Sequence, residues 1–136
     1  MPDHPAINDT EWDILSELWT VERATARELA DRLRASRGWA YSTVKTMLDR
    51  MVKKGLVHAR QVGNVWEYTP AVQPDTARRG AWRRFVDAAF GGAMAPALEF
   101  IATDARLTRS QREKLRRLLD EGASTSARDR LGDQQP

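Results

Sequence analysis

The sequence predicts a mainly α-helical protein with three helices, a two-stranded β-hairpin and then three further helices. Apolar residues recur at three- and four-residue spacing through residues 7–54, which is the spacing of helices that bury one face. Just after Gly55 the pattern changes to alternation around a Gly-Asn pair. Three helices with a hairpin directly after them predict a winged helix-turn-helix domain.

The first two helices each begin with a capping box. Asn8 is followed by Glu11, and Thr25 by Glu28, so that each pair can satisfy free backbone N–H groups at a helix start. Residues 36–38 interrupt the second apolar pattern. The inward faces are predicted to carry Trp12, Leu15, Leu18, Trp19, Ala26, Leu29, Ala30 and Leu33.

Residues 39–55 predict a third helix with two unlike faces, closed by Gly55 as a left-handed C-terminal cap. Its apolar face carries Val44, Met47, Leu48 and Met51. Its other face carries Ser42, Lys45, Thr46, Asp49, Arg50 and Lys53. Hydroxyl and cationic side chains suit base edges and phosphates, so we interpret this segment as a DNA recognition helix.

Within this helix, Ser42, Thr46 and Arg50 lie nearest the middle of the polar face and are candidates for base edges. Tyr41 and Thr43, at the helix start, are candidates for phosphate oxygens. The predicted DNA-binding residues are Tyr41, Ser42, Thr43, Lys45, Thr46, Arg50, Lys53, Arg60 and Asn64.

These assignments have plainer alternatives. A basic amphipathic helix can simply expose a solvated face, and Arg60 can be an ordinary exposed charge on a strand. Lys53 and Lys54 can favour the negative end of the helix dipole. Asp49 can pair with Lys45 or Lys53, each four residues away.

The hairpin is predicted from two β-prone runs, residues 56–62 and 65–69, separated by Gly63-Asn64. Pro70 ends the second run because it cannot donate a ladder hydrogen bond. Trp66 alternates with Tyr68 and, like Trp12 and Trp19, is expected in the core.

The charge distribution agrees with one face meeting a polyanion. The net charge is +3 overall, but residues 1–36 have −4 and residues 37–70 have +4. The basic excess therefore coincides with the third helix and the hairpin.

The C-terminal half is predicted to dimerise. A small helical region cannot enclose this much apolar surface alone, and pairing with a second copy would cover it. The expected interface residues are Trp82, Phe85, Phe90, Leu98, Ile101, Leu115, Leu118 and Leu119. The expected boundaries are 7–72 for the winged-helix domain, 73–121 for a three-helix dimerisation domain and 122–136 for a disordered tail. A two-fold dimer would place two recognition helices about 34 Å apart, as an inverted-repeat operator requires.

Composition narrows the class of protein further. The 136 residues are 41% hydrophobic and 30% charged, include no cysteine, and contain no apolar run near the roughly 20 residues that cross a bilayer. We expect a cytoplasmic protein without membrane insertion. His4 and His58 have no partner at metal-ligand spacing, and the sequence has neither a Gly-rich phosphate loop nor a nucleophile elbow. We therefore expect no metal, no cofactor and no enzymatic activity.

The sequence resembles the penicillinase-repressor family of transcriptional regulators (BlaI/MecI/CopY type) over roughly residues 7–120. The stretches that carry the resemblance are Asp9-Thr10-Glu11-Trp12 with Leu18-Trp19, Trp39 with residues 43–55, residues 63–70, and Phe90-Gly91-Gly92 with Leu98-Glu99-Phe100-Ile101. The resemblance implies a homodimeric winged-helix repressor of a bacterial operon.

In such proteins a membrane sensor protease or its signalling pathway triggers cleavage in the dimerisation domain, and the repressor leaves its operator. The better-known cleaved bond of the family joins Asn and Phe, whereas the matching positions here are Glu99 and Phe100. The copper-responsive branch carries Cys-x-Cys ligands that this chain lacks.

Two other functions remain compatible with the sequence. A winged helix can hold a protein partner instead of DNA, because fold alone does not decide function. A repressor of this shape can also respond to a small molecule bound among its C-terminal helices.

Overall fold

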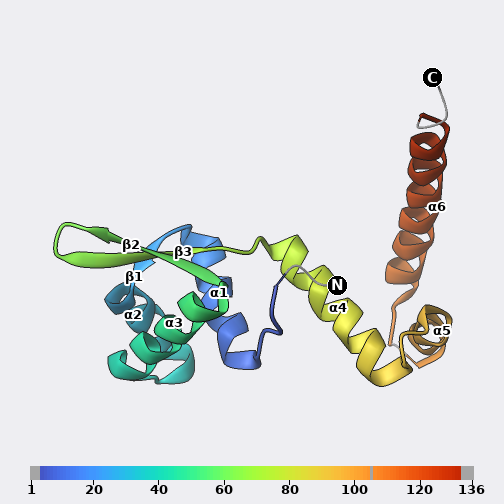
Figure 1. Cartoon of the computed structure of the whole chain (residues 1–136). Coiled ribbons are helices and arrows are strands. Elements are labelled where there is room, and N and C mark those ends of the chain that lie inside the picture. The colour runs from blue at the N-terminus through green and yellow to red at the C-terminus, as the bar shows by residue number, and fades with distance from the viewer. Residues whose placement is uncertain (1–3, 105, 133–136) are drawn as a thin grey trace. The chain divides into compact units, whose positions relative to one another are not determined.

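The computed structural model describes residues 4–104 and 106–132, with side chains described up to residue 122 (Figure 1). Two compact units divide the chain after Met94. The first unit contains α1 (Asp9–Val21), β1 (Ala24–Thr25), α2 (Ala26–Arg37), α3 (Tyr41–Lys54), β2 (Val57–Val62), β3 (Val65–Pro70) and α4 (Pro74–Phe90). Helix α5 (Met94–Asp104) crosses the division and α6 (Arg109–Gly132) follows it.

The three predicted N-terminal helices are present, and both capping boxes form. The Glu11 backbone N–H donates to Asn8 Oδ1 at 2.9 Å, and the Asn8 N–H donates to Glu11 Oε1 at 3.0 Å. Thr25 and Glu28 exchange the equivalent pair of bonds at the start of α2. Side chains of the N-cap and third helical residues thus decide where α1 and α2 begin.

The predicted hairpin is also present, with Val62 opposite Val65 across the Gly63-Asn64 turn. Gly63 has φ 63°, a value that glycine adopts without a side-chain clash. A short strand that the sequence analysis did not predict, β1, pairs antiparallel with β3, so that the sheet order is β1-β3-β2.

A single apolar cluster fills the first unit. It includes Ile14, Leu18, Leu29, Leu33, Val44, Leu48, Met51, Leu56, Tyr68 and Ala77. Ala77 belongs to α4, which therefore packs on the winged helix, although the sequence analysis placed the domain boundary before it. The Trp19 indole N–H donates to the Val72 carbonyl oxygen at 2.9 Å and holds the segment that leads into α4.

The prediction that Trp66 lies in the core is wrong, because its side chain is 48% exposed. Alternation does place Trp66 on the same strand face as Tyr68, which is fully buried. However, β1 pairs with β3 only at Tyr68 and Glu67. Trp66 lies beyond the paired part of β1, toward the hairpin tip, where no helix covers the strand completely.

Helix α4 begins with a proline at its first turn and ends at two glycines in the left-handed region, Gly91 (φ 58°) and Gly92 (φ 84°). Trp82 stacks on Phe85 with ring centroids 6.1 Å apart, and Phe85 meets Phe90 edge-to-face at 5.8 Å. These three predicted interface residues form one aromatic cluster on α4.

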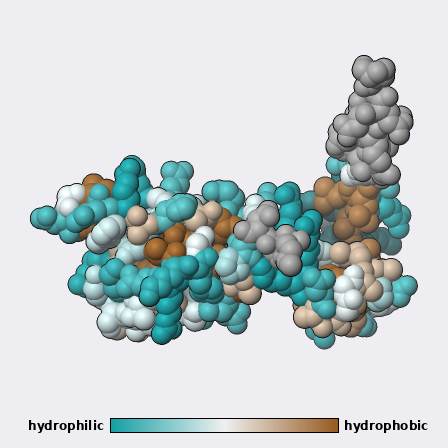
Figure 2. All heavy atoms as spheres, viewed as in Figure 1, coloured by the Kyte–Doolittle hydropathy of each residue, from teal (hydrophilic) through white to brown (hydrophobic). Residues whose placement is uncertain are grey.

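The second unit is thinly packed within one chain. Ala97 is its buried apolar residue among the residues whose side chains are described, whereas Leu98, Phe100, Leu115, Leu118 and Leu119 are exposed. Figure 2 shows brown, hydrophobic atoms at the surface of this unit. An apolar surface of this kind indicates an interaction site.

Helix α6 begins with a capping box formed by Thr108 and Gln111 and continues to Gly132. From the sequence we expected the helical region to end near residue 121 and a disordered tail to follow. An interior glycine costs a helix only about 1 kcal/mol relative to alanine, so Gly122 need not end it. The rest of the predicted tail, residues 133–136, lies outside the described residues.

No single helix among the described residues is long and apolar enough to cross a membrane.

Candidate DNA-binding surface

Helix α3 has the two faces that its sequence predicts. Val44, Leu48 and Met51 are completely buried. The opposite face exposes the predicted base-reading residues Ser42, Thr46 and Arg50, together with Tyr41, Thr43 and Lys53. The Thr46 hydroxyl donates to the Ser42 carbonyl oxygen at 2.9 Å, so its lone pairs remain available to accept from a base amino group.

The start of α3 is suited to a phosphate. Its N-cap residue, Ala40, provides no side-chain cap, and the first backbone N–H groups of a helix have no partner within the helix. These groups carry the positive end of the helix dipole. The Arg27 guanidinium of α2 lies 4.5 Å above the Tyr41 ring, which places a second positive charge beside this end.

Lys45 joins α3 to the wing. Its Nζ donates to Tyr68 Oη of β3 at 2.7 Å and to Asp49 Oδ1 at 3.0 Å, and it lies 5.4 Å from the Tyr68 ring. The hydrogen bonds to Tyr68 and Asp49 raise the Lys45 pKa, so the ammonium remains charged. Of the two lysines predicted as ion-pair partners of Asp49, Lys45 is the one that contacts it. Lys45 thus fixes the recognition helix against the wing, a role that sequence spacing did not reveal.

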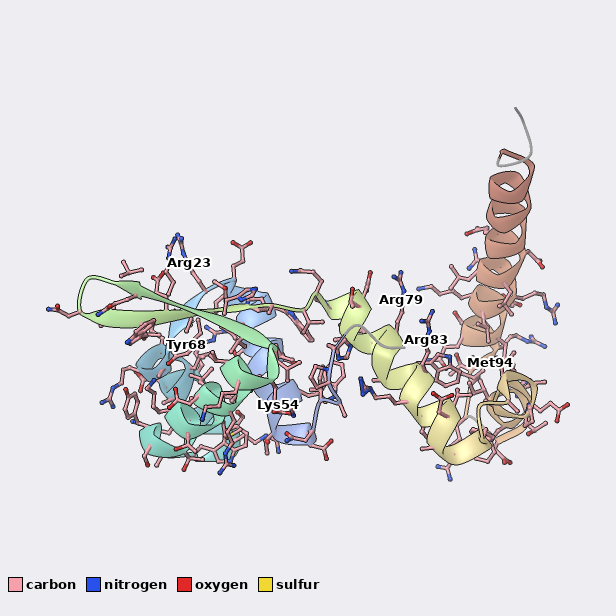
Figure 3. All side chains as sticks on the ribbon, viewed as in Figure 1. Arg23, Lys54, Tyr68, Arg79, Arg83 and Met94 are labelled. Atoms are coloured by element: carbon pink, nitrogen blue, oxygen red, sulfur yellow. The ribbon has the colours of Figure 1, made fainter. Side chains whose placement is uncertain are left out.

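Lys54 is also held within the protein. Its Nζ contacts both oxygens of Glu11, at 2.7 and 2.9 Å, and donates to the Ala6 carbonyl oxygen at 3.1 Å (Figure 3). Lys53, by contrast, is exposed beside Arg50 on the polar face.

The wing contributes a mixed surface. Arg60 and Asn64 are exposed as predicted, and an Arg60 Nη2 lies 3.7 Å from Glu67 Oε1, a loose ion pair that leaves the arginine able to turn toward an anion. Val62, Val65 and Trp66 add exposed apolar surface near the tip.

A groove runs between the wing and the starts of α2 and α3. It is lined by Thr25, Ala26, Arg27, Tyr41, Lys45, Asn64, Val65, Trp66 and Tyr68. Sequence reasoning missed Arg27 and Trp66 as members of this surface. The position of Trp66, two residues after the hairpin turn, could have indicated its exposure, because the ends of strands next to a hairpin turn extend beyond the helices that cover the sheet.

No group of three or more His, Asp or Glu side chains is arranged to hold a metal ion within residues 4–104 and 106–122. A winged helix whose third helix exposes hydroxyl and cationic side chains, with a wing beside it, defines the class of DNA-binding transcription regulators.

The family model described as "Penicillinase repressor" matches residues 7–121, and the chain belongs to this family. It is 25% identical over 118 residues to the penicillinase repressor of Bacillus licheniformis, covering 86% of this chain and 91% of that protein. It is 23% identical to the methicillin resistance regulatory protein MecI of Mammaliicoccus sciuri, covering 84% and 93%. The family is one of transcriptional repressors.

Among solved structures, the chain is similar to monomeric B. licheniformis BlaI in complex with the blaP half-operator. The match has 29% sequence identity and a TM-score of 0.50, and it covers 56% of this chain and 93% of that one. This likeness supports the winged-helix fold of the first unit.

The remaining predicted site residues lie elsewhere. Trp82, Phe85 and Phe90 belong to α4 of the first unit, whereas Leu98, Ile101, Leu115, Leu118 and Leu119 belong to the second. Glu99 and Phe100 are exposed inside α5.

Proposed function

We propose that the protein is a homodimeric repressor that binds an inverted-repeat operator, with α3 of each copy in the major groove. The observation that carries this proposal is the exposed face formed by Ser42, Thr46, Arg50 and Lys53 on a helix whose other face is fully buried. The half-operator complex of the similar BlaI structure supports it. Hydroxyl and arginine side chains match base edges, and the uncapped helix start matches a phosphate.

The dimer follows from the exposed apolar residues of the second unit. Exposure of apolar side chains to water is unfavourable, and burial against a second copy would remove that cost for Leu98, Leu115, Leu118 and Leu119. Two-fold pairing then gives two α3 helices, which is what an inverted repeat needs.

The DNA-binding proposal is tested by anisotropy titration of labelled duplex over a range of salt concentrations. The duplex is selected from random sequence by the full chain, so that no operator has to be known beforehand. Affinity should fall steeply with salt, and Arg50→Ala should lose about 1–3 kcal/mol of binding free energy on the selected site. Arg78→Ala, an exposed arginine on α4 with an Asp75 partner 3.6 Å away, is the matched control. Equal binding by Arg50→Ala and the wild type would remove Arg50 from the reading surface.

Release by proteolysis is proposed at the bond between Glu99 and Phe100. The bond lies within helix α5, where the Thr103 hydroxyl donates to the Glu99 carbonyl oxygen at 2.8 Å, so cutting requires that this turn open first. Mass mapping of the repressor from induced host cells should give a fragment ending at Glu99. An intact chain in cells whose target gene is induced would contradict this mode of release.

A protein-interaction module is the alternative from another class, since winged helices also bind proteins. The exposed apolar residues of the wing favour this alternative, because apolar side chains suit a protein partner; they are Val62, Val65 and Trp66. Failure of the full chain to bind any duplex at low salt would support this alternative. A ligand-responsive repressor is the third candidate, and a small molecule that lowers operator affinity without cutting the chain would indicate it.

A further inference from the structure

Residues 4–11, which lead into the first turn of α1, are here called the N-terminal strap. This strap contacts two other helices of the first unit, α3 and α4. Figure 1 shows the chain running from beside α4 to the start of α1. Its first described residue, His4, is only 9% exposed.

His4 makes two polar contacts with α4 and one within the strap. The His4 carbonyl oxygen accepts a hydrogen bond from Arg84 Nη2. The ring Nε2 lies 3.3 Å from the Thr76 carbonyl oxygen, and Nδ1 lies 2.8 Å from the Pro5 carbonyl oxygen. The imidazole therefore sits along the side of α4 between its first and third turns.

A glycine makes room for this ring. A Cβ atom on Gly80 would lie 2.8 Å from His4 Cε1 and closer still to Nε2, whereas nothing in the fold of α4 requires glycine at a mid-helix position. Glycine lowers the stability of the helix by about 1 kcal/mol relative to alanine, and its missing side chain leaves the space that the His4 ring occupies.

At its other end the strap is tied to the recognition helix. Lys54, the last residue of α3, donates to the Ala6 carbonyl oxygen and contacts the carboxylate of Glu11, whose side chain is buried. A continuous series of hydrogen bonds and packed groups thus runs from the end of α3 through the strap to Arg84 of α4.

From this arrangement we propose that the N-terminal strap sets the angle between the recognition helix and α4, and thereby selects the spacing of the two operator half-sites. The proposal rests on the dimeric, operator-binding function proposed above. Helix α4 carries Trp82, Phe85 and Phe90, the aromatic residues of the expected dimer interface, so in a dimer that uses them the angle between α4 and α3 determines where each copy presents its α3. His4, Gly80 and Arg84 are positioning residues that touch no DNA.

The test compares DNA probes that differ only in half-site spacing. The probes are the inverted repeat selected by the wild-type chain, the same repeat with one base pair added or removed at its centre, and a single half-site. The full-length variants are Gly80→Ala, His4→Ala and the double substitution. Gly122→Ala is the control, because it is also a helical glycine, and within the described part of the chain no atom outside its chain neighbours and its own helix backbone lies within 4 Å of its added Cβ.

In Gly80→Ala the ring of His4 should move rather than α4, because alanine favours the helix and His4 lies outside any helix or strand. The variant should bind the half-site as well as the wild type does, while its preference for the selected spacing falls by about fivefold or more. His4→Ala should show the same loss, and the double variant no further loss, because both changes release the same contact. Gly122→Ala should keep the wild-type preference.

An unchanged spacing preference in Gly80→Ala and His4→Ala would overturn the role of the strap while leaving the proposed function intact. An equal loss on every probe, the half-site included, would also overturn it, because that result describes a general structural defect. If the wild-type chain itself shows no preference for an inverted repeat, the proposed function fails, and the role of the strap fails with it.

Discussion

The two units of this chain differ in how much of their apolar surface they bury within one copy. The first unit encloses Ile14, Leu18, Leu48 and Met51 completely. The second unit leaves Leu98, Leu115, Leu118 and Leu119 exposed, although its described elements are all helices. Helix formation alone therefore does not bury an apolar face. In the first unit a second layer covers that face, and in the second unit we expect another copy of the chain to cover it.

The largest effect on stability should come from a substitution in the buried core of the first unit. Leu48→Ala removes a side chain that is fully buried between the helices and leaves a cavity, which should lower the free energy of unfolding by about 2–5 kcal/mol. Urea denaturation followed by circular dichroism measures this. The same truncation at Leu118 should lower the stability of the isolated monomer by less than about 0.5 kcal/mol. Similar losses at both sites would break the comparison between the units.

Self-association should depend on the second unit more than on the core of the first unit. Leu118→Glu places a charge on the apolar face of the second unit and should weaken self-association by about 2 kcal/mol or more, as measured by sedimentation equilibrium. Ser110→Glu adds the same charge to an exposed polar position of α6 and should leave association unchanged. A Leu118→Glu dimer as tight as the wild type would move the interface elsewhere.

A smaller effect is expected where the backbone of the first unit is strained. Glu22, which ends α1, has φ 72° and ψ −39°, a conformation costly for a residue with a side chain. Glu22→Gly should raise the free energy of unfolding by up to about 1 kcal/mol, in thermal or chemical denaturation. Ser16→Gly, in the middle of the same helix, should lower it by about 0.5–1 kcal/mol. A destabilised Glu22→Gly protein would show that other contacts of this side chain outweigh the strain.

The smallest effect concerns pH. Tyr68 and Asp49 raise the Lys45 pKa above its ordinary 10.5 in the folded protein. The contribution of Lys45 to stability is therefore fully present below pH 10.5 and is lost as the pH rises through the folded value. The stability difference between the wild type and Lys45→Gln should be constant near neutral pH and shrink above pH 10.5. A stability difference between the wild type and Lys45→Gln that grew with pH would contradict the sign.

Local chemistry made much of the first unit predictable. The capping boxes at Asn8 and Thr25 fixed two helix starts, and the Gly63-Asn64 pair fixed the hairpin register, because each depends on residues only a few positions apart. The polar face of α3 was predictable for the same reason.

Contacts between distant segments were not predictable. The Lys45–Tyr68 and Lys54–Glu11 pairs join residues far apart in the sequence, and no period or spacing encodes them. The exposure of Trp66 depends on where β1 stops pairing with β3, which strand alternation does not record. Side-chain type predicted which faces are polar, and tertiary packing decided which charges remain available for a partner.

The shared carboxylate of Glu11 has a consequence for how the first unit opens. Glu11 Oε1 accepts the Asn8 N–H bond that completes the capping box at the start of α1, and both carboxylate oxygens accept from Lys54 at the end of α3. Fraying of either helix end thus removes a partner from the other. Amide hydrogen exchange in the first turn of α1 and the last turn of α3 should therefore proceed with a common opening free energy, so that two segments distant in sequence behave as one cooperative unit.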